Sequence, residues 1–226
     1  MPSKRFWSVV FLCLAVSFST ACVSGPPPTA VERGETALAE GDWRSAKKHF
    51  AEALRADPRL GRAWFGQARA QLAGGDPEGT LRSLSSLSKV DPALFLGEAR
   101  ATYAEGLDAA TRQRLGREQS EAALVAVRAL MKLEPDRRGL DSLLGRALVS
   151  EAARRRWLGD PKGALLLYRE ACQVAPNTLD AWLGAAEILI EFKQGREAMQ
   201  LLEVARKTHP TAGQIRTLTI QALGSR

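Results

Sequence analysis

The chain has 226 residues, of which 45% are hydrophobic, 25% charged and 6% aromatic. This composition is typical of a globular protein and excludes a disordered or collagen-like chain. Three cysteines and two histidines are too few for a disulfide scaffold or a conventional zinc cluster. The formal net charge of +7 suits nucleic-acid binding, but the N-terminus argues against that class of partner.

Residues 1–21 predict an export signal. Lys4 and Arg5 precede an apolar run from Phe6 to Phe18, and three small residues then lead to Cys22. The run is shorter than the roughly 20 apolar residues that cross a bilayer, so a cleaved secretory signal is expected and not a spanning helix. Export argues against nucleic acid as a partner.

The residues before Cys22 resemble the lipobox of bacterial lipoproteins, apart from Ser19, where that family prefers Leu. The resemblance implies cleavage before Cys22 and lipidation of this cysteine. Since Val23 is not Asp, it also implies sorting to the outer membrane, facing the periplasm. The alternative is ordinary cleavage after Ala21, which would give a soluble periplasmic protein. Residues 22–29 are Pro-rich and predict an extended tether.

Cys172 is the single cysteine that remains beyond Cys22. It lies in an apolar helical pattern, Ala164 to Cys172, and therefore predicts a buried structural thiol and not a nucleophile.

Residues 30–224 are internally repetitive. A small, a bulky and another small residue recur at matched offsets before a proline, as with Ala46, Phe50, Ala53 and Pro58. The pattern resembles the tetratricopeptide repeat, a 34-residue helix–turn–helix unit. The resemblance implies an all-α, right-handed superhelical solenoid of about five repeats, with residues 211–223 as a capping helix. The closing prolines are Pro58, Pro92, Pro135, Pro176 and Pro210.

Two repeats are longer than the others, because the prolines are spaced by 34, 43, 41 and 34 residues. We place the extra residues of the third repeat around residues 106–116 and those of the fourth in a first helix over residues 140–158. First helices of neighbouring repeats run parallel, so these two are expected to protrude side by side.

Positive charge concentrates in residues 137–169, which hold eight basic and three acidic residues. If the two long helices lie together, their arginines form a basic ridge that could bind an acidic protein or anionic lipid; the alternative is a solvated arginine face. The ridge would consist of Arg112, Arg114, Arg117, Arg154, Arg155 and Arg156.

In the tetratricopeptide-repeat family, residues at fixed positions of the first helices line a peptide-binding groove. Phe65 is the candidate hot spot of the groove if it is exposed between Arg62 and Arg69; the alternative is that it packs inside its helix pair. Carried over by position, the groove residues are Arg62, Phe65, Arg69, Leu72, Tyr103, Leu107, Ser142, Arg146, Val149, Asp180, Leu183, Glu187, Ile190 and Glu191.

The sequence has no HExxH, GxSxG, P-loop or Rossmann motif. We therefore expect no catalytic residues, no cofactor, no metal and no small-molecule substrate. The architecture is similar to pilotin-type lipoproteins that help type IV or Tad pilus secretins to assemble. This resemblance implies a scaffold that holds an extended peptide or helix of an envelope protein. The alternatives are a lipoprotein of outer-membrane protein assembly and a tether for a peptidoglycan enzyme.

Overall fold

The computed structural model describes residues 27–225, and all regular structure within them is helical. The all-α class is therefore confirmed. The expected signal and Cys22 lie outside the described residues. The helices are α1 (Ala30–Ala39), α2 (Trp43–Ala56), α3 (Gly61–Ala73), α4 (Pro77–Val90), α5 (Pro92–Leu96), α6 (Arg100–Gly116), α7 (Ser120–Leu133), α8 (Leu140–Trp157), α9 (Pro161–Val174), α10 (Leu179–Glu191), α11 (Gly195–Thr208) and α12 (Gly213–Gly224).

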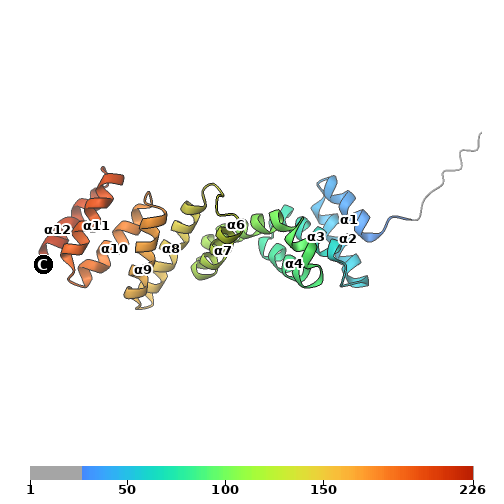
Figure 1. Ribbon diagram of the computed structural model, residues 1–226, viewed down its shortest axis with the longest axis horizontal. Coiled ribbons are helices and arrows are strands. Elements are labelled where there is room, and N and C mark those ends of the chain that lie inside the picture. Colours follow the sequence, from blue (N-terminus) through green and yellow to red (C-terminus); the bar gives the residue numbers. More distant parts are fainter. Residues whose placement is uncertain (1–26, 226) are drawn as a thin grey trace, which may run out of the picture.

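The helices form five antiparallel pairs that follow one another along the long axis of the molecule, from α1 at one end to α12 at the other (Figure 1). The pairs are α1/α2, α3/α4, α6/α7, α8/α9 and α10/α11, and α12 packs on the last of them. Each pair contacts its neighbours in the chain, and the buried hydrophobic residues of the described part form three successive clusters along the array. The expected solenoid of five repeats with a capping helix is confirmed.

The turn inside every pair has the same construction. The residue two positions before the second helix has a positive φ, and it is Gly41, Gly75 or Gly159 in three of the pairs. A left-handed residue ends the first helix, and glycine takes this conformation without a Cβ penalty. In these three pairs the next residue is aspartate, whose carboxylate accepts backbone N–H bonds from the following helix.

Bulky side chains of the second helices pack onto glycines of the first helices. The Phe50 ring of α2 lies against Gly34 of α1 and Gly66 of α3, where an added Cβ would lie 2.2 Å from the ring. Tyr168 of α9 lies in the same way on Gly184 of α10. The Phe50 ring thus fills the gap inside its own pair and also joins repeat one to repeat two.

The inserted residues lie elsewhere than predicted in the third repeat. Helices α6 and α8 have 17 and 18 residues, against 13 in α3 and α10, while the second helices of all five pairs have 14. Since the turn to the second helix is constant, the added residues of α6 and α8 lie at their N-terminal ends. The rest of the third-repeat insertion forms α5. Placing it around residues 106–116 was wrong, because proline spacing gives the size of an insertion but not its position.

The insertions are packed into the array. Leu94 of α5 is buried in a cluster with Phe65, Leu84 and Leu87, and Leu140 and Leu143 in the extra turn of α8 are buried as well. The expected pair of helices protruding side by side is therefore not observed, because α5 and the added turn of α8 carry apolar residues that neighbouring helices cover.

Cys172 is 7% exposed in α9. Burial raises the pKa of its thiol to about 12, so the thiol is neutral at any physiological pH. The prediction of a buried structural thiol is confirmed. Within the described residues, no helix is both long and apolar enough to cross a membrane.

Candidate protein-interaction face

The constant turn sets the register of the first helices, because each ends four residues before its second helix begins. In this register Arg62 of α3 corresponds to Glu105, Arg146 and Asp180 in α6, α8 and α10. Leu72 corresponds to Leu115, Arg156 and Ile190 in the same way. These aligned residues of α3, α6, α8 and α10, together with those between them in the same register, form the first-helix face, which is the candidate interaction site.

Three of the predicted groove residues fall outside this register. They are Tyr103, Leu107 and Ser142, which a count from the preceding proline would select, whereas the insertions move the first-helix positions further along the chain. Leu107 is buried, and Tyr103 packs its ring on Phe95 of α5 at 5.3 Å between centroids. Arg112 and Arg156, which were assigned to the ridge, belong to the first-helix face instead.

Phe65 is not the exposed anchor that the sequence suggested. Its side chain is 8% exposed and belongs to the core cluster between α3, α4 and α5. Arg69 lies over the ring at 5.6 Å from its centroid and also binds Glu35 of α1. The alternative, in which Phe65 packs inside the array, is confirmed.

Arginines on the first helices bind carboxylates one repeat away. Arg62 makes a two-pronged ion pair with Glu98 before α6, with nitrogen–oxygen distances of 2.6 and 2.8 Å. Arg156 of α8 binds both Glu187, at 2.5 Å, and Glu191 of α10. Each of these ion pairs joins one repeat to the next. The Arg62–Glu98 pair has the bidentate geometry that a guanidinium group and a carboxylate favour.

The proposed basic ridge is largely neutralised. Arg114 is 18% exposed at its side chain and binds Glu78 at the start of α4, which lowers the pKa of that carboxyl group. Arg112 binds Asp108 of its own helix. Five of the six ridge arginines have a carboxylate partner, and Arg117 has none among residues 27–225. The three ridge arginines of α8, Arg154, Arg155 and Arg156, bind carboxylates of α7, α8, α10 and the turn before α9. These carboxylates are Glu121, Glu151, Asp160, Glu187 and Glu191.

Glu151 is the buried centre of this network. Its carboxylate is 1% exposed and accepts hydrogen bonds from Arg154 at 2.8 Å, from the Ser120 hydroxyl at 2.8 Å and from Arg155 at 3.2 Å. These donors lower the pKa of Glu151 to about 2. Because Ser120 begins α7 and Glu151 lies in α8, the bond joins repeats three and four. In the sequence, Glu151 is one of three acidic residues in the basic segment 137–169, and nothing there predicts that it is buried.

The middle of the first-helix face keeps charges without partners. Glu105, Arg146 and Asp180 are exposed, and none has an ion pair among the described residues. Beside them, Val149, Leu183 and Ile190 are partly buried hydrophobic residues packed on the core. A row of alternating charge beside apolar side chains can bind a peptide through ion pairs and partial burial. Within residues 27–225, no group of three His, Cys, Asp or Glu side chains is arranged to hold a metal ion.

Models of the tetratricopeptide repeat match residues 31–79 and 158–221, together half of the chain. The chain is a tetratricopeptide-repeat protein. The stretch between the two matches holds most of α4, then α5 to α8, and thus both insertions that depart from the family's regular length. A tetratricopeptide-repeat fold provides a surface for protein–protein interaction.

Solved structures of low sequence identity resemble the tetratricopeptide-repeat array of this chain. MamA is 16% identical, with a TM-score of 0.41, and the match covers 80% of this chain and 90% of MamA. PilF of Pseudomonas aeruginosa is 15% identical, with a TM-score of 0.40, and the match covers 86% and 82% of the two chains. No curated protein sequence matches the chain.

Proposed function

We propose that this tetratricopeptide-repeat protein is a non-catalytic, lipid-anchored scaffold that binds protein partners and assists assembly of a bacterial envelope complex. The observation that carries the binding role is the first-helix face. Glu105, Arg146 and Asp180 come from three successive repeats and are exposed without ion pairs among the described residues, whereas Arg62, Arg69 and Arg156 of the same face are paired within the array. A partner with matching charges can replace water at these three positions.

The sequence before the array supports the anchor. Lys4 and Arg5, the apolar run after them and Cys22 fit a lipoprotein signal. Thr29 caps α1 and accepts a hydrogen bond from the backbone N–H of Glu32, so the array begins a few residues after Cys22. The tether between them reaches at most about 26 Å when extended, which would hold the first repeat close to the periplasmic surface of the outer membrane.

The complex that we propose is a type IV or Tad pilus, or its secretin, because Cys-anchored repeat lipoproteins serve such assemblies. The five repeats also favour a second candidate, the lipoprotein of outer-membrane protein assembly. The two candidates differ in the partner that the face would hold.

Fractionation tests the anchor. The Cys22→Ser variant should leave the outer-membrane fraction and appear in the soluble periplasm. If the variant still fractionates with the outer membrane, lipidation at Cys22 does not anchor the protein.

Crosslinking tests the face and identifies the partner. A photo-crosslinking residue at Leu183 should capture a pilus or secretin subunit, and Arg146→Glu should reduce that capture at least about fivefold, because a rim charge contributes to recognition. Arg138→Glu, a change at an exposed arginine outside the first helices, is the matched control. Capture of a barrel-assembly protein would select the second candidate, and capture that Arg146→Glu leaves unchanged would exclude this face.

A further inference from the structure

Among the helices of residues 27–225, α12 has the register of a first helix, and no second helix of its own packs on it. Helix α12 begins three residues after Pro210, as α10 begins three residues after Pro176. In this register Ile220 and Leu223 of α12 correspond to Ala186 and Leu189 of α10. Those two residues are completely buried in the fifth pair, whereas Ile220 and Leu223 are 63% and 49% exposed. The side of α12 that would face a second helix is therefore open.

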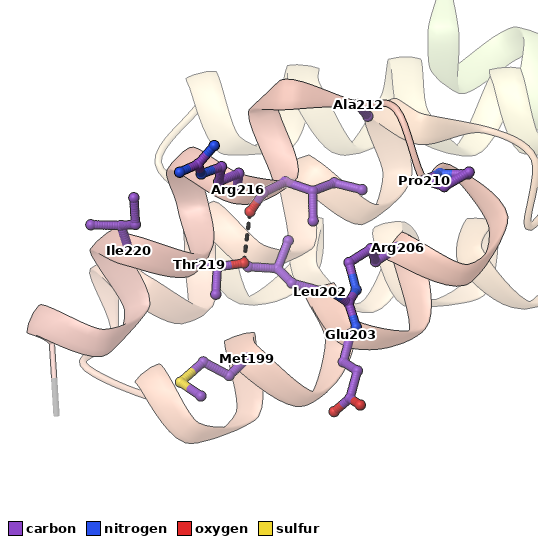
Figure 2. A pocket seen from close by; sticks show the side chains of 10 residues that line it. Met199, Leu202, Glu203, Arg206, Pro210, Ala212, Arg216, Thr219 and Ile220 are labelled. Carbon is purple, nitrogen blue, oxygen red and sulfur yellow. Dashed lines mark hydrogen bonds between the residues drawn. The ribbon is translucent and has the colours of Figure 1, made fainter.

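A groove lies along this open side. It has a volume of about 550 Å³ and runs between α11 and α12 (Figure 2). Leu202, Ile215 and Ile220 supply apolar lining, and Thr219 turns its hydroxyl inward to donate to the backbone carbonyl of Ile215 at 2.7 Å. The Thr219 hydroxyl is therefore satisfied within α12. Leu202 and Ile215 are already buried in the array, so an occupant of the groove would mainly bury the exposed side chain of Ile220.

The charges at the rim indicate the kind of occupant. Arg206 and Arg216 line the groove with one acidic residue, Glu203. Both arginines are exposed, and neither has a carboxylate within ion-pairing distance among residues 27–225. A two-fold dimer through this groove would bring Arg216 toward the same residue of its copy, because an isologous interface repeats each patch. Like charges at such a contact are unfavourable, so an acidic occupant fits better than a second copy.

We propose that the groove between α11 and α12 binds an amphipathic helix of a partner protein, which takes the place of a second helix and carries acidic residues along its edge. Such a helix would bury Ile220 and Leu223 with its apolar side and bind Arg206 and Arg216 with its carboxylates, as in other helix-in-groove complexes. The site lies at the far end of the array from α1 (Figure 1) and depends neither on export nor on the first-helix face.

The probe for this site is a labelled synthetic peptide of about 18 residues, long enough to form a marginally stable helix in water. It carries the small–bulky–small spacing of Ala198, Leu202 and Ala205 with glutamates along one edge. We expect it to bind the full-length chain, purified in mild detergent, in a fluorescence-anisotropy titration. A matched peptide with lysines at the glutamate positions should bind at least about tenfold more weakly.

Variants of the chain locate the binding. Ile220→Ser and Arg216→Glu should each weaken binding of the glutamate peptide about tenfold. Both residues are exposed, so the variants should fold, which circular dichroism checks. Val125→Ser, at another exposed apolar residue, and Arg138→Glu are the controls. Equal binding of the two peptides, absence of binding, or equal affinity in all four variants would overturn the proposal. Self-association of the chain that Ile220→Ser abolishes would assign the groove to a second copy instead.

Discussion

The junctions between repeats are built in two ways. In two of them a large ring lies on a glycine: Phe50 packs on Gly66, and Tyr168 packs on Gly184. The residues in the same register are Leu84 and Ala109 at the second junction, and Val127 and Ser150 at the third. The residue of the second helix becomes smaller as the opposing residue becomes larger. At the four junctions between the five helix pairs, the summed volume of the two residues therefore varies less than either residue does.

The junction with the smallest apolar residue also holds the buried polar network. Between repeats three and four, Val127 is accompanied by the Ser120–Glu151 hydrogen bond and by Arg154. Repeats one and two have no buried carboxylate at the corresponding place, where Gln67 stands in the register of Glu151. The ring-on-glycine junctions should consequently depend on packing, and the third junction on hydrogen bonding and pH.

The largest expected effect is at the ring-on-glycine junction. Phe50→Ala should lower the free energy of unfolding by about 3–5 kcal/mol, because the ring is fully buried and its loss leaves a cavity between two repeats. Urea unfolding followed by circular dichroism measures the change. Leu166→Ala, at an exposed residue of α9, should cost less than about 0.5 kcal/mol. A small effect of Phe50→Ala would mean that the first two repeats are not joined by this ring.

Removing the buried carboxylate should affect the third junction. Glu151→Ala should cost about 1–3 kcal/mol, since the Ser120 hydroxyl and two guanidinium groups lose their acceptor. Glu121→Ala removes a carboxylate that also binds Arg154 but is 77% exposed, and it should cost less than about 1 kcal/mol. Equal urea midpoints for the two variants would show that burial of Glu151 adds nothing.

The complementary volumes can be tested by converting one junction into another. Gly66→Ala should destabilise the chain by about 1–3 kcal/mol, because its new Cβ would overlap the Phe50 ring. Adding Phe50→Leu reproduces the Leu84–Ala109 combination and should recover part of the loss. If the double variant is as unstable as the sum of the two single variants, the two positions are not coupled.

The third junction should also weaken in acid. The pKa of Glu151 is about 2 in the folded chain, below its ordinary value of 4.5. Its contribution is therefore complete above pH 4.5 and is lost as the pH falls toward 2. The difference in unfolding free energy between the unaltered chain and Glu151→Gln should shrink between pH 5 and pH 2.5 in urea titrations. A difference that stays constant over this range would contradict the assignment of Glu151 as the titrating group.

The smallest effect is expected at the turns. Glu118 and Lys193 hold positive φ angles where the other three pairs have glycine. Lys193→Gly should raise the unfolding free energy by about 0.5–1 kcal/mol, because it relieves a left-handed conformation that costs a side chain roughly 1–2 kcal/mol, partly offset by glycine's larger unfolded-state entropy. Gly159→Ala, the opposite change in repeat four, should destabilise by a similar amount in thermal unfolding.

Much of the fold was predictable because it depends on short-range pattern. The small–bulky–small spacing and the closing prolines gave the number of repeats, and Asp42, Asp76 and Asp160 begin helices where an aspartate is a good cap. The interaction face was less predictable. Phe65 has the spacing of a groove residue, but α5, an insertion that proline spacing could not locate, helps to cover it.

By itself, the sequence determined the class, the repeat number, the capping helix and the buried state of Cys172, because each follows from residues close together in the chain. Tertiary structure decided where the arginines go. The carboxylate that pairs with an arginine is set by distance in the folded chain and not by distance along the sequence. For Arg62, Arg114 and Arg156 the partner lies one repeat away. Part of the positive charge is therefore paired across the junctions between repeats. Arg146, Arg206 and Arg216, which have no such partner, are the cations on which both proposals depend.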